Sequence, residues 1–240
     1  MTFPNMKKPS APTIPTDPVR PRGDHAESPV VQIDGLRKHF RSGGEDIAVF
    51  DNFGLTLASG QSLALVGRSG SGKSTLLNML SGLEGWSAGS ITLFGESLAA
   101  ASARWSELRR CAIATVFQEA NLMPALTLLE NVRLRADIAG RDGADAKDWL
   151  DRLGIGSLAA RYPDQVSGGQ RQRAALAMVF GMQPRLLLAD EPTGSLDGHT
   201  AADVADVLFE FQRAQGCPMI LATHDPALAK RCDHTVSLGG

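Results

Sequence analysis

Short apolar runs alternate with longer amphipathic stretches through most of the chain. The runs at residues 62–66, 112–117, 186–189 and 219–222 consist almost entirely of apolar residues. Such runs are typical of parallel strands that are covered on both faces. The stretches with helical spacing lie at residues 76–80, 102–110, 126–138, 146–153, 171–180 and 202–215. This alternation predicts an α/β fold with a mostly parallel, doubly wound sheet.

A different pattern precedes the first of these strands. Residues 30–36 alternate between apolar and polar positions, and residues 47–50 and 55–57 are two further short strand-like segments. We expect the three segments to form a small antiparallel β subdomain, with residues 41–46 as a polar loop. Residues 90–94 predict one more strand, between two turns.

Proline content and apolar periodicity along the chain also predict its domain organisation. Residues 1–29 contain seven of the thirteen prolines and no periodic apolar pattern, which predicts a disordered or polyproline-like arm. Residues 30–240 are long enough for one α/β domain with a good core. Within that domain, residues 119–173 are expected to form a helical insertion that leaves the sheet and returns to it. Ser102 is expected to cap the short helix that it begins.

Composition narrows the classes of function. The 240 residues carry a net charge of −2, and no basic stripe argues for nucleic acid binding. The three cysteines are odd in number and scattered, which suits a reducing compartment and not a disulfide framework. No apolar run approaches the ~20 residues that cross a bilayer, and the first residues form no apolar leader. We therefore expect any work at a membrane to depend on another chain.

A glycine-rich segment follows the apolar run at residues 62–66. It consists of Gly67, Arg68, Ser69, Gly70, Ser71, Gly72, Lys73, Ser74 and Thr75, and it fits the pattern of a phosphate-binding loop. Gly70 and Gly72 let the backbone curl its N–H groups into one hollow, to which the helix start adds positive charge. Lys73 would bridge the β- and γ-phosphates, and the Ser74 hydroxyl would hold Mg²⁺. The alternative, an ordinary glycine turn, is disfavoured by the flanking strand and helix.

Polar residues end several of the predicted parallel strands, where sheets of this kind bind ligands. Asp190 is placed to reach Mg²⁺, and Glu191 is placed to orient an attacking water. Gln118 can join the Mg²⁺ ligands or contact that water, and His224 can donate a hydrogen bond to the γ-phosphate. Taken alone, Asp190 and Glu191 would be charges at a helix entry, and His224 would be a structural histidine. The phosphate loop favours the catalytic interpretation.

Two further features fit a nucleotide site. A second helix begins with small residues, Ser167, Gly168, Gly169 and Gln170, and a helix start of this kind binds anions. In isolation the same residues would be only a helix cap. Phe40 is placed to stack on an adenine ring, although a core position at the end of a strand explains its spacing equally well.

Together these residues resemble the ATPase subunit of an ATP-binding-cassette transporter, over nearly everything after residue 30. The matching motifs are, in chain order, Phe40, the phosphate loop at residues 67–75, Gln118, the signature at residues 166–170, Asp190 with Glu191, the turn at residues 195–197, and His224. The signature is the most specific of them, because unrelated phosphate-loop enzymes lack it.

The resemblance implies a head-to-tail homodimer that binds ATP and Mg²⁺. Each ATP would lie between the phosphate loop of one subunit and residues 167–169 of the other, and Asp197 would cross the interface. Hydrolysis at Glu191 would release the dimer. This cycle of opening and closing would drive a membrane partner through a helix seated near residues 118–129.

Finer features are similar to the lipoprotein-releasing and macrolide-exporter group, namely residues 118–131, 189–197 and 226–233. This similarity implies an integral membrane permease as partner and a peripheral position on the cytoplasmic face of the inner (plasma) membrane. Two residues depart from the family pattern. Val166 stands where leucine is usual, and Met178 stands where arginine is usual, so we expect a surface contact there to differ.

Two other functions fit parts of the pattern. A soluble cassette ATPase that acts on DNA or ribosomes would need a long coiled coil, zinc-binding cysteines or a second cassette, and the sequence predicts none of these. A phosphate-loop kinase would transfer phosphate to a metabolite, but the signature at residues 166–170 argues against it. We therefore expect an ATPase that has no nucleic acid partner.

Overall fold

The computed structural model describes residues 29–42 and 45–239. The expected arm at residues 1–29 lies outside the described residues, apart from its last residue. The strands are β1 (Val31–Ser42), β2 (Glu45–Leu57), β3 (Ser62–Val66), β4 (Ala88–Leu93), β5 (Glu96–Leu98), β6 (Ile113–Val116), β7 (Leu186–Asp190), β8 (Met219–Ala222) and β9 (His234–Ser237). The α-helices are α1 (Lys73–Leu80), α2 (Arg104–Cys111), α3 (Leu128–Ile138), α4 (Ala146–Arg152), α5 (Gly168–Met182), α6 (Gly198–Gln215) and α7 (Pro226–Ala229).

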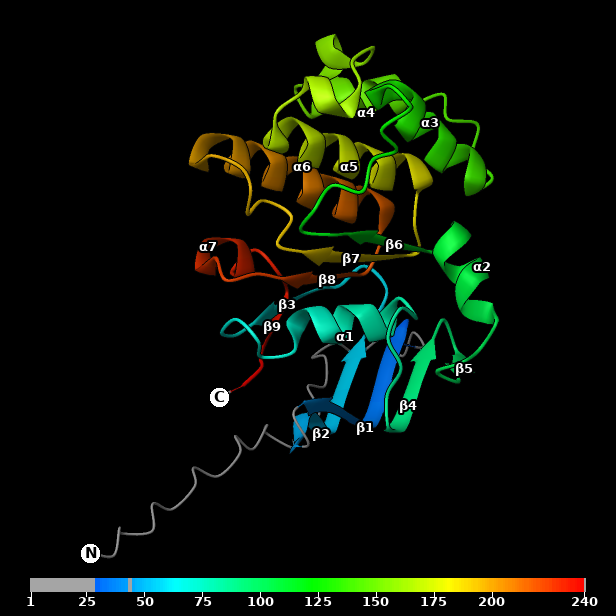
Figure 1. Cartoon of the computed structure of the whole chain (residues 1–240), viewed down its shortest axis with the longest axis vertical. Helices are drawn as coiled ribbons and strands as arrows, with labels where there is room; N and C mark the ends of the chain where they lie inside the picture. The colour runs from blue at the N-terminus through cyan, green and yellow to red at the C-terminus, as the bar shows by residue number, and fades with distance from the viewer. Residues whose placement is uncertain (1–28, 43–44, 240) are drawn as a thin grey trace, which may run out of the picture.

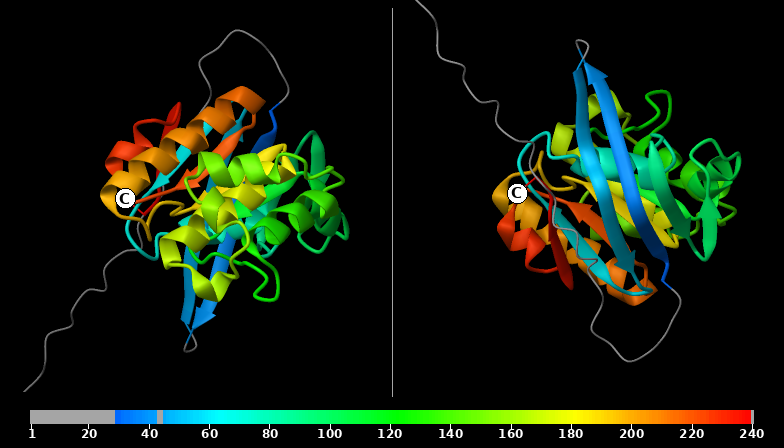
Figure 2. Two further views of the ribbon diagram at one scale, coloured as in Figure 1. Left: turned by 90° about the horizontal axis from the view of Figure 1, so that it is seen from above. Right: turned by 90° about the horizontal axis from the view of Figure 1, so that it is seen from below.

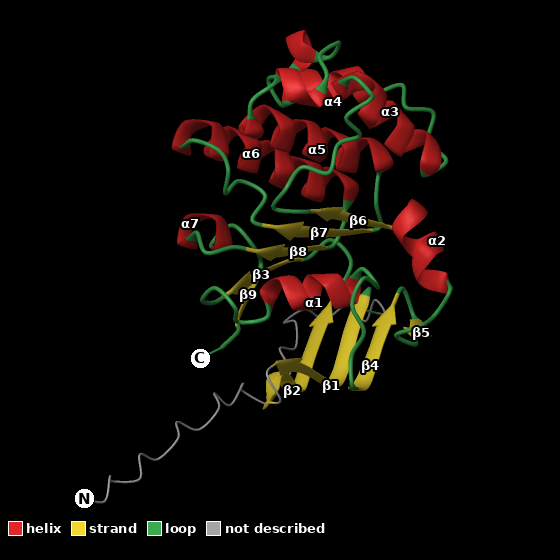
Figure 3. Cartoon of the chain, viewed as in Figure 1, coloured by secondary structure: helices red, strands yellow, loops and turns green. Residues whose placement is uncertain are grey.

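Five strands form a parallel sheet at the centre of the molecule, in the order β6-β7-β8-β3-β9. Four of its five strands, β3, β6, β7 and β8, coincide with the four apolar runs of the sequence. Strands that are covered on both faces have no face exposed to solvent, so they carry few polar residues. Helices lie on both faces of this sheet (Figure 3). The predicted doubly wound α/β fold is confirmed.

The second sheet is antiparallel and has the order β2-β1-β4-β5. Its long strands β1 and β2 run side by side on the face of the molecule opposite α3 and α4 (Figure 2). The prediction of two strands at residues 47–50 and 55–57 was wrong, because β2 runs through both. Asn52 takes a left-handed conformation with φ of 60°, and register shifts nearby let β2 bend without losing its partner. The prediction of a polar loop at residues 41–46 was wrong for its described residues, which are strand, since Arg41 pairs with Asp46 and Ser42 with Glu45.

Two hydrophobic cores cover the two faces of the parallel sheet. Helix α1 lies between the parallel and antiparallel sheets (Figure 1), and its Leu76, Leu77 and Leu80 belong to one core. Helices α3, α4, α5 and α6 build the other core on the opposite face. Strand β7 contributes Leu186 to the first core and Leu187 to the second, as the alternation of side chains along a strand requires. The phosphate-loop helix is therefore held from both sides.

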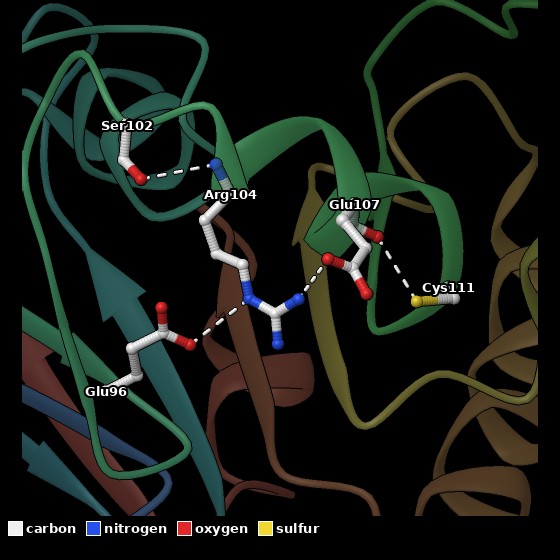
Figure 4. A network of polar contacts seen from close by, with 5 residues as sticks. All are labelled: Glu96, Ser102, Arg104, Glu107 and Cys111. Carbon is white, nitrogen blue, oxygen red and sulfur yellow. Dashed lines mark hydrogen bonds and ion pairs between the residues drawn. The ribbon is translucent and has the colours of Figure 1, made fainter.

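The connection from β5 to α2 contains the predicted helix cap, Ser102. Helix α2 begins at Arg104, and Ala103 before it already has a helical backbone. The predicted cap at Ser102 is confirmed, because its hydroxyl accepts a hydrogen bond from the Arg104 N–H at 3.2 Å. The Arg104 guanidinium pairs with Glu107 on the same helix and with Glu96 of β5 (Figure 4). The three-residue strand β5 was not predicted, because it is too short to show a pattern.

Helices α3 and α4 lie farthest from the antiparallel sheet, above α5 and α6 (Figure 1). They fall within the helical insertion expected at residues 119–173, whose boundaries as a subdomain stay a prediction. No helix in the part of the chain that the structure describes is both long and apolar enough to cross a membrane. Cys111, Cys217 and Cys232 are free thiols, and burial raises the pKa of Cys217 to about 12.

Candidate functional site

A cavity of about 600 Å³ opens where the phosphate loop, the carboxyl ends of the central strands and the antiparallel sheet meet. Its lining comes from segments far apart in the chain: Phe40, Val49, Gly67, Arg68, Ser69, Gly70, Gly72, Lys73, Ser74, Thr75, Gln118, Asp190, Glu191, Gly194 and His224. The fold thus brings the phosphate loop together with all four polar residues predicted at the strand ends. It does not bring Ser167, Gly168, Gly169, Gln170 or Asp197 to this cavity.

The phosphate loop needs glycine for reasons of space. Gly67 has a φ of 156°, and a Cβ there would come within 2.4 Å of the Leu238 carbonyl oxygen. Gly72 has a φ of 96°, and a Cβ there would come within 2.7 Å of the Val49 side chain. Any side chain at either position would displace the loop from the antiparallel sheet or from the last strand. The loop is therefore held tightly while its inner side stays open to the cavity.

The donors of the phosphate loop suit an anion. The Lys73 side chain is nearly buried, and its Nζ donates to the carbonyl oxygens of Gly67 at 2.8 Å and Arg68 at 3.1 Å. The first hydrogen bond of α1 runs from the Leu76 N–H to the Gly72 carbonyl at 2.9 Å, so the amides of residues 73–75 have no acceptor within the helix. The Ser71 hydroxyl oxygen is buried without a hydrogen-bond partner among the described residues. A positive charge and free amides face one hollow, whereas the Ser71 hydroxyl lies beside Gly67 and outside the cavity lining.

Glu191 has a strained backbone. Its φ is 47°, a left-handed conformation that costs a residue with a side chain about 1–2 kcal/mol. Two backbone hydrogen bonds hold it there: its N–H donates to the Ala222 carbonyl at 2.9 Å, and its carbonyl accepts from the Gly194 N–H at 3.0 Å. Strain that the surroundings enforce in this way is typical of functional positions. The turn directs the Glu191 carboxylate away from the strand line and keeps it only 17% exposed.

Two residues after β8 contact the Glu191 carboxylate. His224 Nδ1 lies 2.8 Å from Oε1, and the buried Thr223 hydroxyl donates to Oε2 at 3.4 Å. The His224 side chain is 76% exposed, so this contact can break without disturbing the core. Thr223 was not predicted, although its position beside His224 at a strand end is a signal that would have found it. Glu191 and His224 therefore act as neighbours, an arrangement that the sequence alone does not reveal.

The remaining residues predicted to bind the nucleotide or Mg²⁺ surround this pair. Asp190 ends β7 and is half-buried, while Gln118 and Ser74 are exposed to the cavity. Phe40 is 39% exposed at the cavity mouth, which excludes the alternative of a core position at the strand end. Its ring lies 4.6 Å from Lys38 Nζ. Val49 at the cavity wall was not predicted, since its neighbours in β2 are not a recognisable motif.

A separate place on the surface holds the signature residues. Helix α5 begins at Gly168, where the Ser167 hydroxyl accepts from the Gln170 N–H at 3.2 Å and the Gln170 side chain accepts from the Ser167 N–H at 2.8 Å. A Cβ on Gly168 would meet only a guanidinium nitrogen of Arg171, at 3.8 Å, so this side of the helix start is open. Gly169 packs against Leu196, because a Cβ there would come within 2.9 Å of the leucine side chain.

Asp197 stands at the start of α6. Its side chain accepts a hydrogen bond from the Thr200 N–H at 3.1 Å and caps the helix. That bond, which favours the charged carboxylate, lowers the pKa of Asp197. The contribution to stability is present above the ordinary pKa of an aspartate and is lost as the pH falls through the lowered value. The turn at residues 195–197 thus lies beside the signature helix, away from the phosphate loop.

Comparisons with known proteins give a consistent result. A family model described as "ABC transporter" matches residues 50–194. The ABC transporter ATP-binding protein YbbA of Escherichia coli K12 is 41% identical over 215 residues, which is 87% of this chain and 94% of YbbA. The lipoprotein-releasing system ATP-binding protein LolD of Xanthomonas euvesicatoria is 39% identical over 214 residues, which is 87% of this chain and 88% of LolD.

The chain is also similar to solved structures of one cassette protein. A dimeric, post-hydrolysis structure of the ATP-binding cassette MJ0796 with ADP and Pi has a TM-score of 0.82 and 30% identity. It aligns with 87% of this chain and 94% of that one. A second dimeric structure of MJ0796, described as a bacterial ABC transporter cassette, has a TM-score of 0.81.

Proposed function

The chain belongs to the ABC transporter family and corresponds to the ATP-binding subunit of such a transporter. On this basis we propose that it hydrolyses ATP with Mg²⁺ to drive a membrane-embedded partner. The observation that carries the proposal is the cavity in which the phosphate loop faces the largely buried carboxylate of Glu191, whose backbone is strained. A phosphate-binding loop alone would bind nucleotide. A fixed carboxylate opposite it adds a group that can accept a proton from water.

Each residue of the cavity has a role in this proposal. Lys73 and the amides of residues 73–75 hold the phosphates, and Lys73 exchanges its two carbonyl contacts for phosphate oxygens. The oxygen atoms of Ser74, Asp190 and Gln118 form a donor set that suits Mg²⁺, which would neutralise charge on the phosphates.

Glu191 accepts a proton from the attacking water and orients it in line with the γ-phosphate. His224 holds the Glu191 carboxylate when no nucleotide is bound, and turns to the γ-phosphate when one is. The mobile contact of an exposed histidine with a fixed carboxylate suits this exchange.

We further propose that two copies of the chain close on ATP. The cavity described above has no lining residue from the helix start at residues 167–170, whereas that helix start presents amides and an open Gly168 to the surroundings. A second copy, placed head to tail, would supply its helix start to the γ-phosphate of this one. The dimers of MJ0796, a cassette of similar fold, support this arrangement.

Gly168→Leu tests the dimer in isolation from the cavity. Because the Gly168 position has room for a side chain within its own chain, the variant is expected to fold with an unchanged melting temperature. It is expected to bind ATP but to lose the ATP-dependent dimer and at least 90% of turnover, about a tenfold loss, since the added side chain meets the partner's nucleotide. Light scattering with and without ATP measures the dimer. A variant that still dimerises and turns over normally contradicts a shared site.

The membrane partner is the part of the proposal that lies outside this chain. We propose an integral membrane permease, with the chain bound peripherally at its cytoplasmic side. The similar LolD, named as the ATP-binding protein of a lipoprotein-releasing system, supports a multi-component assembly. The chain, purified from its native cells in mild detergent with an affinity tag, is expected to bring down one integral membrane protein in a stoichiometric amount. If it comes down alone, or with DNA or ribosomes, the transporter assignment fails and the soluble alternative is favoured.

A further inference from the structure

A short segment connects the nucleotide cavity with the signature helix. Gln118 lines the nucleotide cavity, and it also lines a second cavity of about 340 Å³ together with Gly168, Arg171, Gln172 and Ser195. Residues 118–122 lie between strand β6 and helix α3. Whatever fixes this segment therefore fixes Gln118 relative to both the phosphate loop and the signature.

The buried amide of Gln172 fixes the near end of the segment. Gln172 is on α5 and only 1% exposed, whereas the other buried residues of that helix are apolar or glycine. Its Nε2 donates to the carbonyl of Phe117 at 3.1 Å. The pairing of β6 with β7 ends one residue earlier, at Val116, so this carbonyl lies beyond the sheet ladder. An amide buried here is explained by that one acceptor, since a buried polar group without a partner is destabilising.

The buried amide of Asn131 fixes the far end. Asn131 is on α3 and is also 1% exposed. Its Oδ1 accepts from the Met123 N–H at 2.7 Å, and its Nδ2 lies 3.1 Å from the Met123 carbonyl oxygen and 3.1 Å from that of Leu126. Met123 itself is 52% exposed, so the clamp holds its backbone and leaves its side chain in solvent. Five residues, 118–122, span the gap between the two anchored ends.

We propose that Gln172 is a positioning residue that ties Gln118 to the signature helix α5, so that the two move as one body. The hydrogen bond from Gln172 to Phe117 joins helix α5 to the end of strand β6 in the central sheet. When Gln118 engages Mg²⁺ or the attacking water, the displacement of Phe117 is passed directly to α5 and hence to Ser167 and Gly168. The inference rests on the proposed function and adds a residue to it.

The test compares two buried glutamines. Gln172→Met keeps the length of the side chain and removes the donor to Phe117. Gln212→Met is the matched control, because Gln212 is 2% exposed on α6 and donates to the carbonyls of Gly60 at 2.8 Å and Cys217 at 3.1 Å, away from both cavities. Gln172→Met loses one buried hydrogen bond and Gln212→Met loses two, so both are expected to melt at a lower temperature. Only Gln172→Met releases the segment at residues 118–122.

The kinetic readout separates positioning from stability. Measured on the full chain well below the melting temperatures, Gln172→Met is expected to lower kcat about 10- to 100-fold, because small misplacements of reacting groups cost that much, with a KM for ATP within about threefold. Gln212→Met is expected to keep both values within about twofold. Equal kcat values for Gln172→Met and the unmodified chain, or equal losses in both variants, overturn the proposal.

Hydrogen exchange provides a second readout that does not depend on turnover. In Gln172→Met the amides of Leu122 and Met123, which donate to the Ala120 carbonyl and the Asn131 side chain, are expected to exchange at least tenfold faster than in the unmodified chain, and in Gln212→Met their rates are expected to be unchanged. Unchanged exchange in Gln172→Met also overturns the proposal. If Gln172→Met does not fold, Gln172→Leu removes the same hydrogen bond to Phe117 with a smaller side chain. An unmodified chain without any ATP turnover would instead contradict the proposed function.

Discussion

The Glu191→Gln variant is expected to bind ATP as the unmodified chain does and to hydrolyse it about 10²–10⁴ times more slowly, the loss that follows when a general base is removed. The amide keeps the shape of the side chain and its contacts to Thr223 and His224, but it cannot accept a proton from water. The phosphate loop is unchanged, so nucleotide affinity is retained. Because ATP is not consumed, the closed dimer accumulates. Single-turnover hydrolysis and light scattering with ATP measure the two effects.

A surface carboxylate supplies the control. Glu210 pairs with Arg152 on the outside of the molecule at 2.8 Å, and Glu210→Gln is expected to leave turnover within about twofold of the unmodified value. If Glu191→Gln hydrolyses ATP as fast as Glu210→Gln, the proton acceptor is another group and the strained turn at residue 191 has a different purpose.

Lys73→Ala is expected to lower kcat/KM for ATP about 10³-fold. In the proposed site the lysine is a charged donor to phosphate, and losing such a donor from a preorganised site removes stabilisation that water does not replace. In the structure Lys73 Nζ donates to the carbonyls of Gly67 and Arg68, so it already lies against the phosphate loop. A large part of the loss is expected in ATP binding, which calorimetry measures. The effect on the melting temperature is expected to be small.

Lys147→Ala is the matched control for Lys73→Ala. Lys147 lies on the surface of α4 and pairs with Asp151 at 2.6 Å, one turn along the same helix. An exposed pair of this kind contributes little, so its loss is expected to leave ATP binding and turnover unchanged. Tight ATP binding by Lys73→Ala, equal to that of the control, would remove the phosphate loop from the account.

The fold was largely predictable because burial leaves a mark on the sequence. The apolar runs that form β3, β6, β7 and β8 contain no alternating polar positions, so their strands were clear. The glycine-rich loop showed where α1 begins. The antiparallel sheet was less predictable. Asp51 and Asn52 resemble a turn, but β2 absorbs them as a bend, because the partner strand β1 provides hydrogen bonds across it. The residue pattern within one segment does not show which distant strand it will pair with.

The meeting of the strand-end residues at one cavity was predictable, and their arrangement there was less so. Strand ends identify Asp190, Gln118 and His224 as neighbours, since the carboxyl ends of parallel strands meet at one edge. The left-handed turn at Glu191 was not predictable, because a glutamate rarely adopts it and no local residue demands it. Gln172 and Asn131 were missed for a similar reason. In a helix of mixed polarity a glutamine or asparagine suggests an exposed face, and only the packed structure reveals that both are buried.

The central claim is that ATP is bound between two copies of the chain, and the structure of the Glu191→Gln variant with ATP and Mg²⁺ tests it most directly. The account predicts a head-to-tail dimer in which each triphosphate contacts Lys73 of one copy and Ser167 and Gly168 of the other. A triphosphate enclosed by a single copy, with Gly168 and Gly169 facing solvent in the closed form, would contradict it.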